Sequence, residues 1–140
     1  MGIEENFWQC SRCGRTFPHV NQAHSCVTYS VAEHFGDKPA NLKQTFNYLV
    51  QKVGEFGPVR VDAVQTAISL GARSHFAMIY PLKNSLNLEL WSNKPIDSRR
   101  VFKKQMISPG NYLFHIKLVN QTDVDSELLS WLRQAYFLKS

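Results

Sequence analysis

The chain has 140 residues, of which 44% are hydrophobic and 19% charged, a balance typical of one globular domain and not of a disordered chain. Its longest apolar runs are only a few residues, too short for a helix that spans a bilayer. A net charge of +5 permits an anionic partner but does not require one. The acidic N-terminus lacks the basic start and apolar middle of a signal peptide. These features predict a cytoplasmic protein with no membrane partner.

Three cysteines lie close together near the N-terminus, and their odd number argues against complete pairing in disulfides. Cys10 and Cys13 have the Cys-x2-Cys spacing that turns two thiolates onto one ion. His24 and Cys26 complete a Cys3His set that suits a tetrahedral Zn²⁺ site. His19 provides an alternative fourth ligand in place of Cys26. We favour Cys26, because thiolate is the stronger ligand for zinc and the residue would otherwise be a spare thiol.

The predicted zinc site is structural, because four protein ligands leave no position open for a catalytic water. Gly14 follows the second cysteine and can adopt the positive φ that such a turn often needs. A segment of about thirty residues is too small to build an adequate core, so metal binding would supply most of its folding free energy. The sequence therefore predicts a zinc-binding knuckle at residues 1–29 and an α+β domain at residues 30–140.

Helical signals open the second part of the chain. Ser30 and Glu33 fit a capping box, and Gly36 would end the short helix that follows. Apolar residues at helical spacing predict a second helix over residues 42–53. A last helix is predicted from about Thr122 to the C-terminus, with its apolar residues along one face.

Between these helices the apolar pattern changes to a period of two, which predicts strands. The expected strands cover residues 66–70, 75–82, 85–91, 100–107 and 112–118. The stretch 61–67 fits either a strand or a short helix. Grouped strands with helices at both ends indicate an α+β fold, in which an antiparallel meander of about five strands is covered by helices on one face.

The body of the chain shows no known catalytic motif, and its strand region has few carboxylates, which disfavours a metal-dependent nuclease. His75 and His115 lie on predicted strands and could face one another across the sheet. Together with Arg73 or Lys117 they would form a pocket for an anionic ligand if they share a concave face. The alternative is two separate imidazoles, each with its own hydrogen-bond partners.

Basic residues cluster at two places in the sequence. The candidates for phosphate contacts are Arg12, Arg15, Arg99, Arg100, Lys103 and Lys104. On a strand, Arg99 and Lys103 would share one face, so the second run is split between the two faces of the sheet. A solvated edge strand protected by charge explains that run equally well.

The residues of the N-terminal segment match the pattern of a known family. It reads Trp8-x-Cys10-x2-Cys13-Gly14-Arg15-x-Phe17 and continues as Asn21-Gln22-x-His24-Ser25-Cys26. This pattern resembles an uncharacterised bacterial family described as a domain of unknown function, and looser similarity covers nearly the whole chain. The resemblance implies metal ligation by the Cys3His set, with His19 outside the matching pattern. It implies no established reaction, and the predicted transport label of some relatives has no mechanistic support in a chain without apolar spans.

The leading hypothesis is a zinc-stabilised, non-catalytic binding module with an anionic ligand or nucleic acid as its partner. One alternative is a small-ligand-binding protein or enzyme that uses a pocket near His75 and His115. Another is a protein-interaction module that presents the knuckle to a partner.

Overall fold

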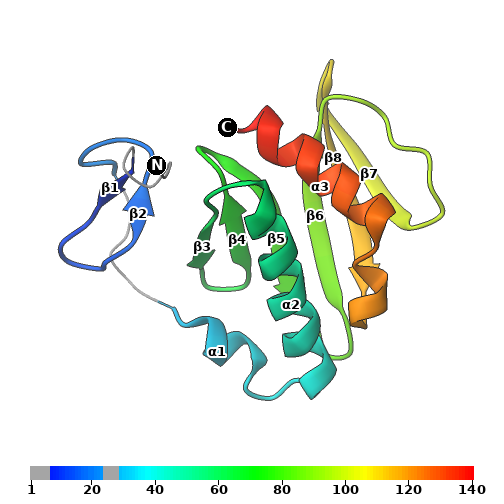
Figure 1. The fold of residues 1–140 in the computed structure, drawn as a ribbon, viewed down its shortest axis with the longest axis horizontal. Helices are drawn as coiled ribbons and strands as arrows, with labels where there is room; N and C mark the ends of the chain where they lie inside the picture. Colours follow the sequence, from blue (N-terminus) through cyan, green and yellow to red (C-terminus); the bar gives the residue numbers. More distant parts are fainter. Residues whose placement is uncertain (1–6, 24–28) are drawn as a thin grey trace.

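The computed structural model describes residues 7–23 and 29–140, and its main feature is a six-stranded antiparallel sheet (Figure 1). The strand order is β3-β4-β5-β6-β8-β7. The strands are β3 (Arg60–Ala63), β4 (Ile68–Gly71), β5 (His75–Pro81), β6 (Leu86–Ser92), β7 (Val101–Ser108) and β8 (Asn111–Leu118). The predicted α+β class is confirmed, and β3 overlaps the stretch whose pattern fitted either a strand or a short helix.

The strand order departs from the simple meander that the sequence suggests. From β6 the chain passes to the edge strand β7 and returns through β8, which lies between them. Ser92 at the end of β6 is opposite Tyr112, whereas Val101 at the start of β7 is opposite Ile116, so residues 93–100 run back along the sheet. Ile96 in this connection is buried in the core. Alternation within the strands does not reveal this order, because the order depends on the path of a connection that is exposed or only partly buried apart from Ile96.

The helices α2 and α3 lie on the same face of the sheet (Figure 1), as predicted. The helical elements are α1 (Val31–Phe35), α2 (Ala40–Val53), α3 (Ser126–Leu138) and the 3-10 turns η2 (Gly54–Phe56) and η3 (Gln121–Asp123). The Ser30 hydroxyl accepts a hydrogen bond of 3.0 Å from the Glu33 amide, which caps α1 as expected. In the described part of the chain no helix is long and apolar enough to cross a membrane.

The C-terminal helix begins later than its sequence signal indicates. The Asp123 carboxylate accepts hydrogen bonds from the amides of Val119 and Asn120, at 2.8 and 3.0 Å, and so closes the separate turn η3. Asp125 then caps α3 by accepting a 3.0 Å hydrogen bond from the Leu128 amide. The sequence signal suggested one helix from Thr122, but these two caps produce a separate turn, η3, followed by α3.

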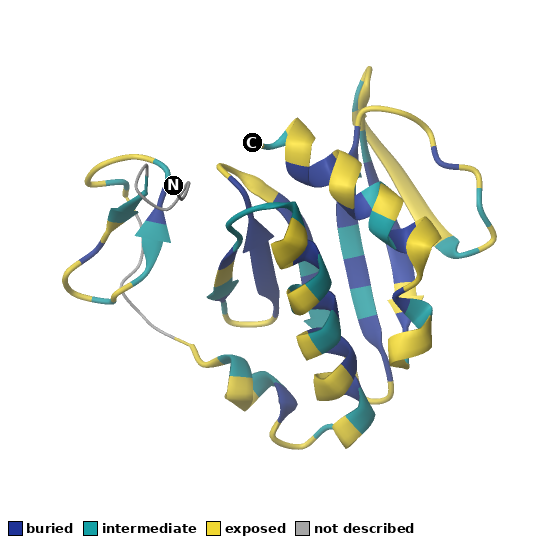
Figure 2. Cartoon of the chain, in the orientation of Figure 1, coloured by how far each residue is buried: buried dark blue, intermediate teal, exposed yellow. Residues whose placement is uncertain are grey.

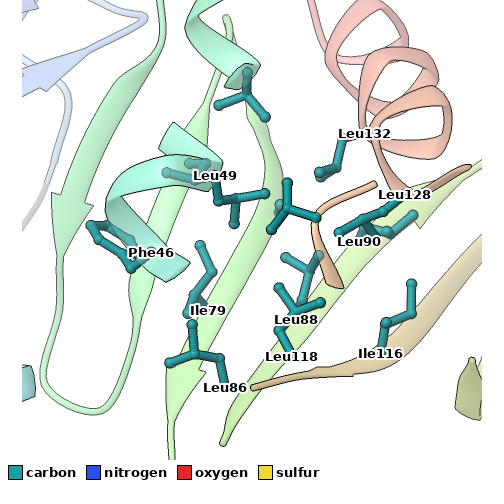
Figure 3. Close-up of a cluster of buried hydrophobic side chains, with 14 of the residues drawn as sticks. Phe46, Leu49, Ile79, Leu86, Leu88, Leu90, Ile116, Leu118, Leu128 and Leu132 are labelled. Atoms are coloured by element: carbon teal, nitrogen blue, oxygen red, sulfur yellow. The ribbon is translucent and has the colours of Figure 1, made fainter. Parts of the chain in front are cut away.

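The hydrophobic core fills the space between the sheet and the two long helices (Figure 3). Ile79, Leu88 and Ile116 lie opposite one another on three neighbouring strands and are fully buried. Helix α2 adds Phe46 and Leu49 to this layer, and α3 adds further leucines. Figure 2 shows that β6 alternates between buried and partly buried residues, whereas the edge strand β7 is mostly exposed. The polar residues of β6 and β8 therefore point to the other side of the sheet, which we call the outer face.

The N-terminal segment forms a small hairpin from β1 (Trp8–Gln9) and β2 (Thr16–Phe17), beside β3 at one edge of the sheet (Figure 1). Arg15 forms an ion pair of 3.5 Å with Asp62 of β3. In the reverse direction, Arg60 of β3 donates a 3.2 Å hydrogen bond to the carbonyl of Thr16. These two contacts hold the hairpin against the body.

Candidate functional site

The Cys-x2-Cys turn has the backbone geometry that the sequence predicts. The Gly14 amide donates to the carbonyl of Cys10 at 2.8 Å, and the Cys10 amide donates to the carbonyl of Arg15 at 2.9 Å. Gly14 has a φ of 76°, a conformation that costs glycine little. The turn that would present the Cys10 and Cys13 thiolates to one ion is therefore formed.

The remaining predicted zinc ligands, His24 and Cys26, lie outside the described residues. Within residues 7–23 and 29–140, no group of three or more His, Cys, Asp or Glu side chains is arranged to hold a metal ion. Both proposed ligand sets include His24. The alternative ligand His19 lines a pocket of about 230 Å³ between the hairpin and the sheet, together with Asp62 and His75.

The three residues of the predicted histidine pocket have separate surroundings. His75 hydrogen-bonds the Ser69 hydroxyl through Nδ1, and burial together with nearby Arg60 lowers the pKa of His75. His115 lies on β8, and β6 separates it from the strand that carries His75. Arg73 contributes its carbonyl, which accepts a 2.9 Å hydrogen bond from Arg60. The structure thus gives each of the three a different local partner.

His115 belongs to a polar cluster on the outer face. Its Nε2 lies 3.4 Å from a carboxylate oxygen of Glu89 and 3.4 Å from the amide oxygen of Gln105. The Phe102 ring covers the imidazole, with ring centroids 6.0 Å apart. Burial lowers the pKa of His115, Glu89 opposes this effect, and Lys103 adds to it. The neutral imidazole is therefore favoured in the folded protein.

Two of the predicted phosphate contacts have structural partners. Arg15 forms the ion pair with Asp62, and Arg100 donates to Asp125 at 2.7 Å and to the carbonyl of Asp123. Arg100 also lies 3.6 Å from Glu127, so it fastens the start of β7 to the start of α3.

The other candidates are distributed over the molecule. Lys103 and Lys104 lie opposite His115 and Phe114 in the sheet. Both side chains are exposed on the edge strand β7. Arg12 lines a shallow pocket beside the cysteine turn. The predicted basic residues therefore do not form one continuous stripe.

A pocket of about 610 Å³ lies where the β5–β6 turn, the end of β8 and the start of β7 meet. We call it the sheet-end pocket. Its polar and aromatic lining comprises Ser85, Asn87, Arg99, Arg100, Phe102, Lys117 and Asp123. Among the described residues, neither Arg99 nor Lys117 has an ion-pair partner. Two uncompensated cations therefore line a concave surface, an arrangement that attracts anions.

Two further residues of the sheet-end pocket, Asn87 and Phe102, bear on what it can hold. The Asn87 amide oxygen is buried and has no hydrogen-bond partner in the part of the chain that the structure describes. Phe102 is 59% exposed. Sequence reasoning selected Arg99 and Arg100 as phosphate contacts and placed Lys117 in a possible anion pocket with the two histidines, but it missed Asn87 and Phe102. The alternation marked Asn87 and Lys117 as outward-facing, but only the register places them opposite each other.

The fold and this site define a class: an α+β domain whose helices cover one face of an antiparallel sheet and whose basic pocket lies at one end of it. The chain belongs to the family described as "Domain of unknown function (DUF5655)", whose model matches residues 31–139. No curated protein and no solved structure matches the chain. The family description names no reaction, ligand or metal.

Proposed function

We propose that this protein is a zinc-stabilised, non-catalytic binding module of the cytoplasm, and that the sheet-end pocket holds its anionic ligand. The observation that carries this proposal is the convergence of Arg99 and Lys117 on one pocket without carboxylate partners among the described residues. A pocket of about 610 Å³ is within the usual size range of small-ligand sites.

The charge balance around the pocket supports an anion over a cation. The carboxylate of Asp123 is held by two backbone amides, and Arg100 is engaged by Asp125 and Glu127. Arg99 and Lys117 have no carboxylate partner among the described residues, so they are the cations of the lining that can pair with an anionic ligand. A phosphate or carboxylate group would complete this arrangement with charge-assisted hydrogen bonds.

The zinc ion of this proposal has a structural role. Cys10 and Cys13 stand on a turn of suitable geometry, and His24 and Cys26 would complete the ligand shell. His19 stays outside the proposed ligand set, because the thiolate of Cys26 is the stronger ligand for zinc. When bound, the ion would hold the N-terminal segment folded. Arg15 and Thr16 would then keep their contacts with β3.

The proposal is tested with inorganic pyrophosphate as the probe. Titration in low-salt buffer, followed by heteronuclear NMR, should shift the amide signals of the sheet-end pocket, and the shifts should weaken as salt is added because ions screen the attraction. We expect Arg99→Gln and Lys117→Gln each to weaken binding by at least fivefold. Neither change removes an ion pair described in the structure, so both variants should fold normally.

The matched control is Arg133→Gln, which removes a positive charge from the exposed side of α3 outside the pocket lining. Its affinity for pyrophosphate should equal that of the unaltered protein. If all three variants weaken binding equally, the effect is one of net charge and the proposed site is wrong. If pyrophosphate does not bind at all, the anion-binding function itself is rejected.

A further inference from the structure

The sheet-end pocket has an aromatic wall as well as cations. Phe102 lies at the start of β7 and is 59% exposed. Its ring also contacts the His115 imidazole. His115 is itself well buried, with 8% of its side chain accessible. The Phe102 ring therefore packs against a buried residue of β8 and also lines the pocket. A planar ligand ring can stack on such a surface.

Asn87 provides a hydrogen-bond acceptor in the same pocket. Its amide oxygen is buried and lacks a partner among the described residues. A buried carbonyl without a partner costs about 1–3 kcal/mol, and a ligand N–H group would remove that cost. Asn87 lies directly opposite Lys117 in the register of β6 and β8. The Asn87 amide, which can accept a hydrogen bond from a ligand, therefore lies beside the Lys117 ammonium, which attracts an anion.

Together these features define a ligand with three parts: an anionic group for Arg99 and Lys117, a planar ring for Phe102 and an N–H donor for Asn87. The geometry points to a nucleoside 5′-phosphate, either free or at the end of a single strand. This inference rests on the proposed function and extends it from any anion to one that carries a nucleobase. A nucleobase is planar and carries N–H donors on its edge, and its phosphate provides the charge.

The test compares adenosine 5′-monophosphate, ribose 5-phosphate and inorganic pyrophosphate as probes in isothermal titration calorimetry. We expect adenosine 5′-monophosphate to bind at least tenfold more tightly than ribose 5-phosphate, because only the former carries the ring. Phe102→Ala should reduce that ratio to about one and leave the affinity for ribose 5-phosphate unchanged. Asn87→Ala should weaken binding of the nucleotide more than that of the sugar phosphate.

Phe137→Ala is the matched control, because Phe137 is 52% exposed on α3 and lies outside the pocket lining. It should bind all three probes as the unaltered protein does. Equal affinity for adenosine 5′-monophosphate and ribose 5-phosphate in the unaltered protein overturns the nucleobase inference but leaves anion binding intact. If none of the phosphates binds, both proposals are rejected. Thermal unfolding of each variant identifies any that fails to fold, and Asn87→Ala then provides an independent test beside Phe102→Ala.

The two sources of the ligand are distinguished by a further comparison. A short single strand with a 5′-phosphate is titrated beside the same strand with a 5′-hydroxyl. Tighter binding of the phosphorylated strand than of free adenosine 5′-monophosphate assigns the pocket to strand ends. Tighter binding of the free nucleotide assigns it to mononucleotides. Equal binding of both strands, at an affinity that Arg99→Gln does not change, contradicts the inference.

Discussion

The Arg60 guanidinium of β3 donates a hydrogen bond of 3.2 Å to the backbone carbonyl of Thr16 in β2. The same side chain donates to the carbonyls of Ala72 and Arg73 at 3.2 and 2.9 Å, and it lies over the Phe7 ring at 4.9 Å. One arginine thus joins the N-terminal hairpin, β3 and the β4–β5 turn. Its planar fork suits this task, because it holds several donors in fixed directions.

Arg60→Lys should loosen this junction, because one ammonium group cannot donate to three carbonyls in these directions. We expect the free energy of unfolding to fall by about 2 kcal/mol. Proteolysis of the N-terminal segment should become faster. Chemical denaturation and limited proteolysis measure the two effects. Arg133→Lys, the same change on the exposed side of α3, should alter neither, and equal behaviour of both variants would contradict the role of Arg60.

Gly57 and Tyr136 are coupled where α3 passes the segment after α2. The Tyr136 hydroxyl donates a 2.9 Å hydrogen bond to the Pro58 carbonyl, and a Cβ at Gly57 would lie 2.5 Å from that hydroxyl. Gly57 also has a φ of 151°, which strains other residues. Tyr136→Phe should cost about 1 kcal/mol of stability. Gly57→Ala should cost about 2 kcal/mol.

The two changes should not add. Removing the hydroxyl relieves the close approach, so Gly57→Ala should cost less in the Tyr136→Phe background than alone. A double-mutant cycle from urea denaturation measures this coupling. Strict additivity would mean that the Tyr136 hydroxyl does not lie this close to residue 57 in solution.

His115 should make the stability depend on pH. Its pKa is lowered in the folded protein by burial and by Lys103, against the opposing effect of Glu89. Below the usual histidine pKa of about 6.5, the unfolded chain therefore binds a proton that the folded protein does not. Stability should fall as the pH falls through this window. His115→Gln should reduce the slope of unfolding free energy against pH between 7 and 5.5.

The comparison of variant and unaltered protein isolates this effect, because contributions from the N-terminal segment are common to both and cancel. His75, whose pKa is lowered by burial and Arg60 and raised by Asp62, is tested separately by His75→Gln. An unchanged slope in His115→Gln would show that the imidazole is protonated equally in both states.

Zinc removal tests the metal proposal. The purified protein should contain about one zinc per chain by elemental analysis, and chelation should broaden or shift the NMR signals of the N-terminal hairpin. Signals of α2 and α3 should change little, because the core of the body has its own buried cluster. Cys26→Ser should lower zinc content more than His19→Ala. The reverse order would favour the Cys2His2 set.

The predictable parts of the fold are those that depend on local patterns. Alternation along residues 75–82 and 85–91 predicted β5 and β6 closely, because one face of each strand meets the core. The spacing of Leu42, Phe46 and Leu49 predicted α2 for the same reason. By contrast, β3 is only four residues long, too few for periodicity to separate it from a helix.

The amino-acid sequence by itself determined the α+β class, the antiparallel sheet, the helices and the cysteine turn, since each follows from the periodicity or spacing of neighbouring residues. Only the tertiary structure decided that β8 lies between β6 and β7 and that Asn87 lies opposite Lys117. It also decided that Arg100 is held by Asp125 whereas Arg99 faces the pocket. These relationships depend on strand order, register and long-range ion pairing. Such features arise from packing the whole chain at once and leave no local pattern in the sequence.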